Sequence, residues 1–269
     1  IDDGTYGLAS FGGSISLDIR PSDLDGDGDL DFVLQASRFN SDSQLRWYEN
    51  DGLENFQFHA LDTDDETQDL GWVPFDAVVD IDNDGHKDII TSTAWYLNDG
   101  AQNFIKQITA PAWASQHTRA FHDMDGDGDL DVVTSSKEYD GSAQVERLRV
   151  YENDGNQNYS AHLIYQSGRW LNGMDTGDID GDGDMDIVVG DRYNSSSAVT
   201  GFKNEGALTF TTYEVSGSYG DGDKVQLIDA DADGDLDVIS ARYDGIAWME
   251  QQSDESFVRY NWLSWGERY

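Results

Sequence analysis

The residues of this chain best able to do chemistry are carboxylates that recur at a fixed spacing. The pattern Asp-x-Asp-x-Asp-Gly-x-x-Asp occurs five times, with copies that begin at Asp23, Asp80, Asp123, Asp178 and Asp229. Within one copy, the carboxylates at positions 1, 3, 5 and 9 can surround a common centre, because the glycine at position 6 permits a sharp turn. These like charges repel one another, and a hard divalent cation removes that cost. All-oxygen ligands favour Ca²⁺ over Zn²⁺, so the sequence predicts about five structural calcium sites, one per copy.

The predicted ligands occupy the odd positions of each copy, with position 7 offering its backbone carbonyl. They are Asp23, Asp25, Asp27, Asp29 and Asp31; Asp80, Asp82, Asp84, His86 and Asp88; Asp123, Asp125, Asp127, Asp129 and Asp131; Asp178, Asp180, Asp182, Asp184 and Asp186; and Asp229, Asp231, Asp233, Asp235 and Asp237. EF-hands are excluded, because position 12 holds Leu, Thr, Thr, Val and Ser instead of the glutamate that an EF-hand needs.

The segments around each copy must position these carboxylates, and they have the pattern of β-strands. An alternating apolar run precedes each copy and a β-branched run follows it, as in Ile15–Ile19 and Phe32–Leu34. A third apolar run ends in a second recurrent motif, seen as Trp47–Gly52 and Trp95–Gly100, whose Asn-Asp-Gly signals a tight turn. A fourth apolar run follows that turn. Trp47 and Trp95 lie in the third run, where we expect core positions.

Four strands in each of five repeats, spaced roughly 50 residues apart, predict an all-β propeller of four-stranded blades. The predicted blades cover residues 14–64, 72–110, 118–166, 171–216 and 223–265 of a single domain. Residues 1–13 are the candidate closing strand. The alternative is that the five repeats are part of a larger propeller, for example one with seven blades.

The segments Asp23–Asp31 and Trp47–Gly52 resemble the FG-GAP/VCBS repeat family. This resemblance implies calcium loops that stabilise the blades of secreted or cell-surface propellers. Family propellers commonly have seven blades, so a count of five departs from the pattern. Sugar binding, adhesion and polysaccharide lyase activity all occur in the family, so the resemblance leaves the function open.

Variable loops at the end of each blade opposite the calcium loops are the expected place for a ligand, because function usually lies on variable loops of a rigid scaffold. Basic, aromatic and Asn or Asp residues recur there, and further aromatic residues come just before each blade. An aromatic face beside hydrogen-bonding side chains suits a sugar ring. The candidate ligand-binding residues are Arg38, Phe39, Asn40, Trp72, Trp113, Tyr139, Trp170, Arg192, Tyr193, Asn194, Arg242 and Tyr243. The alternative role for the tryptophans is packing between blades.

Catalysis has weaker support in the sequence, which favours a non-catalytic role and contains no identifiable catalytic triad. A lyase that acts on uronic-acid glycans needs a base and a cation to neutralise the sugar carboxylate. His117, Arg119 and Tyr193 are the candidates for that alternative. No motif links the three residues, so an ordinary loop position is the favoured interpretation of His117.

Charge and composition narrow the range of partners. The 269 residues include 54 acidic and 16 basic side chains, for a net charge of −38, and no cysteine. Such a field repels phosphate and anionic lipid, so we expect neither a nucleic acid nor a membrane as partner. The chain is 38% hydrophobic and 12% aromatic, which indicates a folded protein. The leading hypothesis is a secreted, calcium-stabilised lectin or carbohydrate-binding module of a larger adhesin or enzyme. The alternatives are the lyase and a protein-binding adhesion domain.

Overall fold

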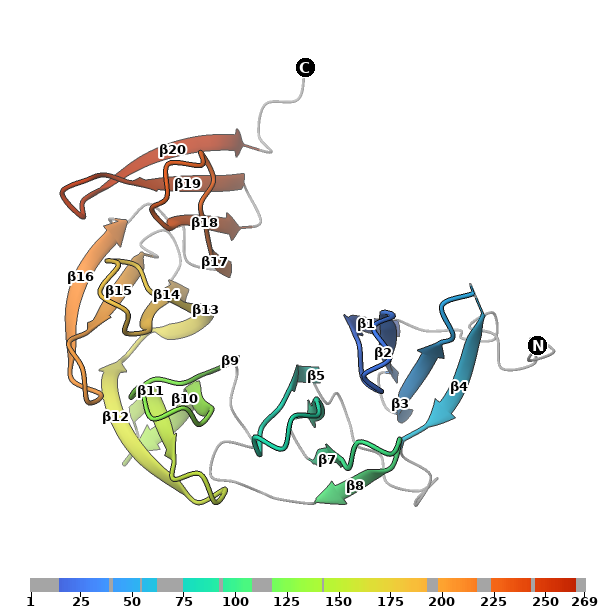
Figure 1. Cartoon of the computed structure of the whole chain (residues 1–269). Helices are drawn as coiled ribbons and strands as arrows, with labels where there is room; N and C mark the ends of the chain where they lie inside the picture. The colour runs from blue at the N-terminus through green and yellow to red at the C-terminus, as the bar shows by residue number, and fades with distance from the viewer. Residues whose placement is uncertain are drawn as a thin grey trace. The chain divides into compact units, whose positions relative to one another are not determined.

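The computed structural model describes residues 15–38, 41–53, 55–61, 75–91, 94–107, 118–141, 143–192, 198–216, 224–242 and 245–264. Within those ranges every regular element is a β-strand, and the twenty strands form five four-stranded antiparallel sheets (Figure 1). The chain divides into two compact units, Ile1–Ala114 and Ser115–Tyr269, and each is described on its own.

Each sheet keeps sequence order, so each is one blade of the predicted kind. The first unit holds the blades β1 Ile15–Ser22, β2 Asp31–Arg38, β3 Ser41–Asn50 and β4 Phe56–Ala60, then β5 Phe75–Val79, β6 Asp88–Thr91, β7 Trp95–Asn98 and β8 Phe104–Gln107. The second holds β9 Thr118–His122, β10 Asp131–Asp140, β11 Ala143–Asn153 and β12 Tyr159–Ser167; β13 Trp170–Gly177, β14 Asp186–Arg192, β15 Val199–Asn204 and β16 Phe210–Ser216; and β17 Lys224–Ile228, β18 Asp237–Arg242, β19 Gly245–Gln251 and β20 Phe257–Ser264.

The middle strands of the blades carry buried apolar side chains, because blades of the same unit pack against one another. Ile89, Val132, Val188 and Val238 are fully buried. Trp47 and Trp95 are also buried, as expected for core positions. The Cβ-branched side chains of these strands favour the extended backbone that such packing requires.

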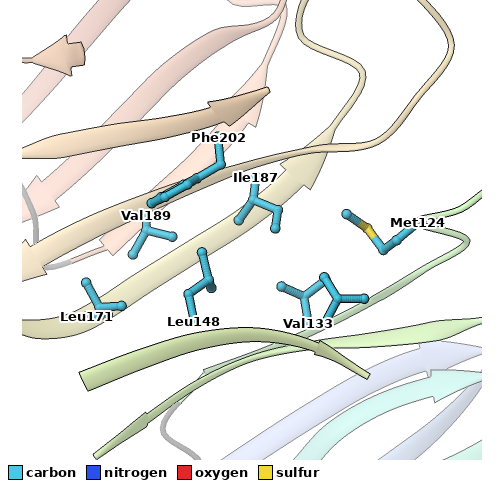
Figure 2. Close-up of a cluster of buried hydrophobic side chains, with 8 residues drawn as sticks. Met124, Val133, Leu148, Leu171, Ile187, Val189 and Phe202 are labelled. Carbon is cyan, nitrogen blue, oxygen red and sulfur yellow. The ribbon is translucent and has the colours of Figure 1, made fainter. Parts of the chain in front are cut away.

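The hydrophobic clusters lie between consecutive blades of the same unit. One cluster joins the third blade to the fourth, where Val133 and Leu148 pack with Leu171, Ile187 and Phe202 (Figure 2). Figure 2 shows these side chains pointing toward one another from two facing sheets. A second cluster in this unit joins the fourth blade to the fifth, and the first unit has one cluster shared by its two blades. Burial between blades therefore supplies the apolar contacts that a single sheet lacks.

Strand order assigns every connection to one of two ends of a blade. The nine-residue Asp loop joins the first strand to the second, and the Asn-Asp-Gly turn joins the third to the fourth, so both lie at one end, here called the carboxylate end. The connection between the second and third strands lies at the other, here called the hairpin end. Across the described ranges, no helix is long and apolar enough to cross a bilayer.

Candidate metal sites and the hairpin-end surface

Each Asp loop gathers three carboxylates at the carboxylate end. Their oxygens lie within 4.8 Å of one another in every loop. Positions 1, 3 and 5 form the group in three loops, and positions 1, 3 and 9 form it in the other two. The groups are Asp23, Asp25 and Asp27; Asp80, Asp82 and Asp88; Asp123, Asp125 and Asp127; Asp178, Asp180 and Asp186; and Asp229, Asp231 and Asp233.

The loop backbone folds around the first aspartate of each copy. Asp23 accepts hydrogen bonds from the N–H groups of Gly26 at 2.8 Å and Gly28 at 3.1 Å. The bond from the position-6 glycine recurs in all five copies, and the bond from the position-4 glycine recurs in the third and fourth. The glycine at position 6 has a positive φ in all five loops, from 93° to 102°, a conformation that side chains disfavour. The shared backbone geometry of the five loops brings the carboxylates together without a helix.

The ninth aspartate joins its loop to the third strand. In the third blade, one oxygen of Asp131 accepts the N–H of Met124 at 2.8 Å and the other accepts the N–H of Asn153 at 2.8 Å. All five copies repeat this pair of bonds, and each ninth side chain is at most 1% exposed. Burial raises the pKa of Asp88, Asp131 and Asp186 to about 6, although the two backbone hydrogen bonds oppose it.

The seventh residue of the loop directs its side chain toward the turn between the third and fourth strands. A Cβ at Gly52 would collide with the Asp29 carboxylate, and one at Gly100 would collide with the His86 ring. Both glycines have positive φ as well, so the turn needs glycine for two reasons. The described carboxylate groups do not include the side chain at position 7. Its backbone carbonyl remains the ligand that the sequence predicts there.

Within each unit, an amide side chain links the second, fourth and fifth blades to the Asp loop of the blade before them, a role that sequence reasoning missed. Asn98 donates to the Leu24 carbonyl at 2.7 Å, and Asn204 donates to the Met124 carbonyl at 2.8 Å. Gln251 donates in the same way to the Ile179 carbonyl at 2.9 Å. The signal was present as an amide at the same position of each second motif, but it was interpreted only as part of a turn.

The residue before that amide gives the loops different charges. It is Glu49, Glu152 and Glu250 beside the first, third and fifth loops, and burial together with neighbouring carboxylates, these glutamates among them, raises the pKa of Asp25, Asp125 and Asp231. In the fourth loop it is Lys203, whose ammonium forms an ion pair with Asp180. The second loop has Leu97 at this position.

The described carboxylates fit a hard divalent cation. Every candidate group is built of oxygen donors alone, which is the donor set that Ca²⁺ prefers. Asp82 also has a buried oxygen, Oδ1, with no hydrogen-bond partner. The carboxylate end therefore has the donor groups that a hard divalent cation needs.

Most of the predicted ligand residues at the hairpin end lie outside the described residues. Arg38, Arg192 and Arg242 are the last residues of β2, β14 and β18, as expected for positions at a strand end, but their side chains are not described. Phe39, Asn40, Trp72, Trp113, Tyr193, Asn194 and Tyr243 lie outside, as does His117, and Arg119 is described only as part of β9. None of the three side chains proposed for a lyase is described, so that alternative stays a prediction.

Tyr139 and Trp170 are the two predicted ligand residues whose side chains are described, and the structure brings them together. Tyr139 lies near the end of β10 and Trp170 begins β13 of the next blade. The Lys137 ammonium lies 5.9 Å from the centre of the Tyr139 ring and 5.7 Å from that of Trp170. The two rings are 65% and 49% exposed, respectively. Two exposed rings on adjacent blades therefore share one lysine ammonium as a neighbour.

Comparison with known proteins gives a family match and a fold match. The family model described as an FG-GAP-like repeat matches residues 23–91, 80–134 and 123–189, which together span more than half of the chain. Among solved structures, a lectin from Agrocybe aegerita, described as specifically recognising non-reducing terminal N-acetylglucosamine, superposes with a TM-score of 0.66. It is 18% identical, and the alignment covers 93% of this chain and 67% of that one. No curated protein matches the chain. The prediction of an all-β propeller of four-stranded blades is confirmed.

Proposed function

The chain belongs to the FG-GAP-like repeat family, and from this premise we propose that it is a calcium-stabilised propeller, secreted or displayed at a cell surface, that binds carbohydrate at its hairpin end. The observation that carries the sugar-binding part is the exposed pair Tyr139 and Trp170, held on two adjacent blades. Exposed aromatic rings stack on the apolar faces of sugar rings. The lectin with a similar fold supports the same choice of ligand class.

The calcium part rests on the five oxygen-only carboxylate groups. Each would be costly without a cation, because at least three carboxylate oxygens lie within 4.8 Å. Ions bound there would assign the chain to the calcium-binding VCBS type of the family. Calcium sites of extracellular modules have dissociation constants of about 10⁻⁴–10⁻³ M, and sites of that affinity fill appreciably only where calcium is abundant, outside the cell.

Isothermal titration of the calcium-loaded protein against a glycan panel tests sugar binding. The panel holds uncharged N-acetylglucosamine oligomers, uncharged glucose oligomers and uronic-acid oligomers, and each sample is analysed for products. We expect binding without turnover. Release of unsaturated sugar would establish the lyase alternative, and absence of both binding and turnover would leave a protein partner as the better hypothesis.

Thermal unfolding with and without a chelator tests the calcium part separately. A ligand that binds only the folded state stabilises it, so chelation should lower the melting temperature steeply and added calcium should restore it. Magnesium at the same concentration is the control, because it tolerates crowded carboxylate sites poorly. Melting that does not respond to the chelator would refute the metal assignment.

A further inference from the structure

The longest hairpin in the described chain carries a set of side chains that the calcium sites do not use. Strands β10 and β11 have ten and eleven residues, and their pairing continues to Asp140 and Ala143. In that register, Lys137 is opposite Glu146 and Tyr139 is opposite Gln144. Directly opposed residues of an antiparallel pair share one face of the sheet. The same face includes Ser135, whose hydroxyl donates to the Leu171 carbonyl of β13, so it faces the next blade.

Glu146 is a buried acid whose carboxylate oxygens have no hydrogen bond of ordinary geometry, although the Gln144 side chain is nearby. Its side chain is 1% exposed, and neither oxygen has a hydrogen-bond partner in good geometry among the described residues. Burial raises its pKa to about 7, while the nearby Lys137 charge and the Gln144 side chain partly oppose that shift. A buried carboxylate without a close partner is costly. Glu146 therefore provides an acceptor whose oxygens can still form hydrogen bonds of ordinary geometry.

Lys137 has the opposite arrangement, because its ammonium lies over two exposed rings instead of over the acid across from it. The ring centres are 5.9 Å and 5.7 Å away. An exposed cation–π contact contributes only about 0.5–1 kcal/mol, so this contact can be exchanged for another at little cost. A lysine stem has enough freedom to move its ammonium between the rings and a neighbour on the same face.

We propose that Tyr139 and Trp170 form the stacking surface for one uncharged sugar ring, and that Lys137 is a movable cover which pairs with Glu146 when the ring docks. The subsite rests on the proposed carbohydrate binding and specifies where and how it occurs. Lys137 and Glu146 have opposite charges, and a net charge of −38 opposes acidic glycans, so the site suits an uncharged ring.

The charges around the cluster are consistent with this choice. Glu138 is already held by ion pairs with Arg147 and Arg149, which lowers its pKa to about 2. Arg169, next to Trp170, is paired with Asp191 at 3.0 Å. These described groups already have partners, which leaves Lys137 and Glu146 as the pair that can rearrange.

Titration of chitotriose, cellotriose and trigalacturonate into the calcium-loaded chain and its variants tests the subsite. For the uncharged sugar that the wild-type chain binds, Trp170→Ala should weaken binding about tenfold or more, and Trp170→Phe should retain most of it. Phe58→Ala is the matched control, because Phe58 is 46% exposed and has the Arg46 cation 5.4 Å from its ring centre, on the outer strand of another blade. It should bind like the wild type.

The cover is tested by two further variants. Lys137→Met keeps the stem without the charge and should bind the sugar at least as tightly as the wild type, because nothing must leave the rings. Glu146→Gln removes the anion that receives the ammonium and should weaken binding about threefold or more. Circular dichroism and melting of each variant confirm folding.

The outcomes separate the two proposals. Sugar binding by the wild type that is unchanged in Trp170→Ala overturns the subsite but leaves carbohydrate binding intact. Loss of binding in Lys137→Met overturns the cover and makes Lys137 a direct contact. A wild-type chain that binds none of the three sugars removes the proposed function and the subsite with it.

Discussion

At the carboxylate end, the five blades share the hydrogen bonds that anchor the ninth aspartate, whereas at the hairpin end they differ in length and in side chains. Every ninth aspartate accepts two backbone N–H groups at the carboxylate end. At the hairpin end, β6 and β7 have four residues each, while β10 and β11 have ten and eleven. Uniform contacts at one end are suited to holding blades together, and variable ones at the other are suited to choosing a ligand.

The two ends also bury acids for different reasons. Asp131 is buried with both oxygens hydrogen-bonded to backbone, and Glu146, on the hairpin of the same blade, is buried with neither. Asp131, with both oxygens hydrogen-bonded, is part of the scaffold, whereas Glu146 is available for a change of partner. The predictions below test whether this division holds.

The largest expected effect is a reversal of the pH dependence of stability when calcium is added. In the chelated protein, burial holds the pKa of Asp88, Asp131 and Asp186 at about 6, above the usual value of about 3.9 in an unfolded chain. The stability from these groups is fully present below the unfolded pKa and is lost as pH rises through about 6. The free energy of unfolding should therefore increase by several kcal/mol as pH falls from about 7.5 to about 5.

With saturating calcium the sign should reverse, because protons compete with the ion for the same carboxylates. Glu146, whose pKa is raised to about 7, also makes the protein more stable as pH falls, and it does so with or without calcium. The Glu146→Gln variant removes this contribution. Urea unfolding over this pH range, with calcium and with chelator, measures both. If the free energy of unfolding of Glu146→Gln rises as pH falls both with calcium and with chelator, the carboxylate end holds no calcium.

Next in size is the difference between two aspartates of one loop. Asp131→Ala leaves the N–H groups of Met124 and Asn153 without acceptors at buried positions, which should cost about 2–5 kcal/mol. Asp129→Ala is the matched control, because that side chain lies against Gly155 at the turn, and it should cost less than about 1 kcal/mol. Urea unfolding in chelator compares the two. Equal losses would mean that the ninth aspartate has no special role in the scaffold.

The sequence predicted the blades well because their signals are local. Strands such as β4 and β8 begin at Phe56 and Phe104, where the pattern after the Asn-Asp-Gly turn places them. Alternation and turn residues act within a few positions, so a single sequence contains them. Recurring residue types also singled out Tyr139 and Trp170 as ligand contacts, and that role stays a prediction. Their shared contact with Lys137 depends on the register of the β10–β11 hairpin.

What the sequence could not supply are roles that depend on neighbours distant along the chain. The link from Asn204 to the Met124 carbonyl spans 80 residues, and nothing near Asn204 points to Met124. The close approach of Asp29 to Gly52 also joins residues that are far apart in the sequence, a loop and a turn of the same blade. Such roles require the packed sheets, and for that reason the turn motif was interpreted only as a turn.

A smaller effect is expected when that link between blades is cut. Asn204→Ala removes the hydrogen bond to the Met124 carbonyl, along with longer bonds to the Met185 carbonyl and from the Gly206 N–H, and should cost about 1–2 kcal/mol because the Met124 carbonyl is buried. The control is Asn156→Ala, since the Asn156 amide bonds only within its own exposed turn, and it should stay within about 0.5 kcal/mol of the wild type. Urea unfolding measures the stability of both variants. If the two are equally stable, the Asn204 amide does not help to hold the blades together.

The smallest effect is expected in calcium affinity at a single loop. Lys203 already neutralises Asp180 in the fourth loop, so an ion must compete with a built-in cation there, while Glu49 and Glu152 add negative charge beside the first and third loops. Stepwise calcium titration followed by native mass spectrometry should show one ion that binds more weakly than the rest. Lys203→Leu copies the leucine of the second blade and should tighten that step about tenfold, as expected for removal of one contacting charge.

Lys106→Leu controls for the loss of one positive charge elsewhere, because Lys106 lies over the Tyr96 ring, 5.7 Å from its centre. If all five ions bind alike in the wild type, or if the two leucine variants shift the weak step equally, then Lys203 does not set the affinity of its loop. The uniformity of the carboxylate end would in that case extend from its hydrogen bonds to its ions. A selective response to Lys203→Leu would instead show that even the regular end of the blades carries differences between copies, set by one side chain outside the repeated nine residues.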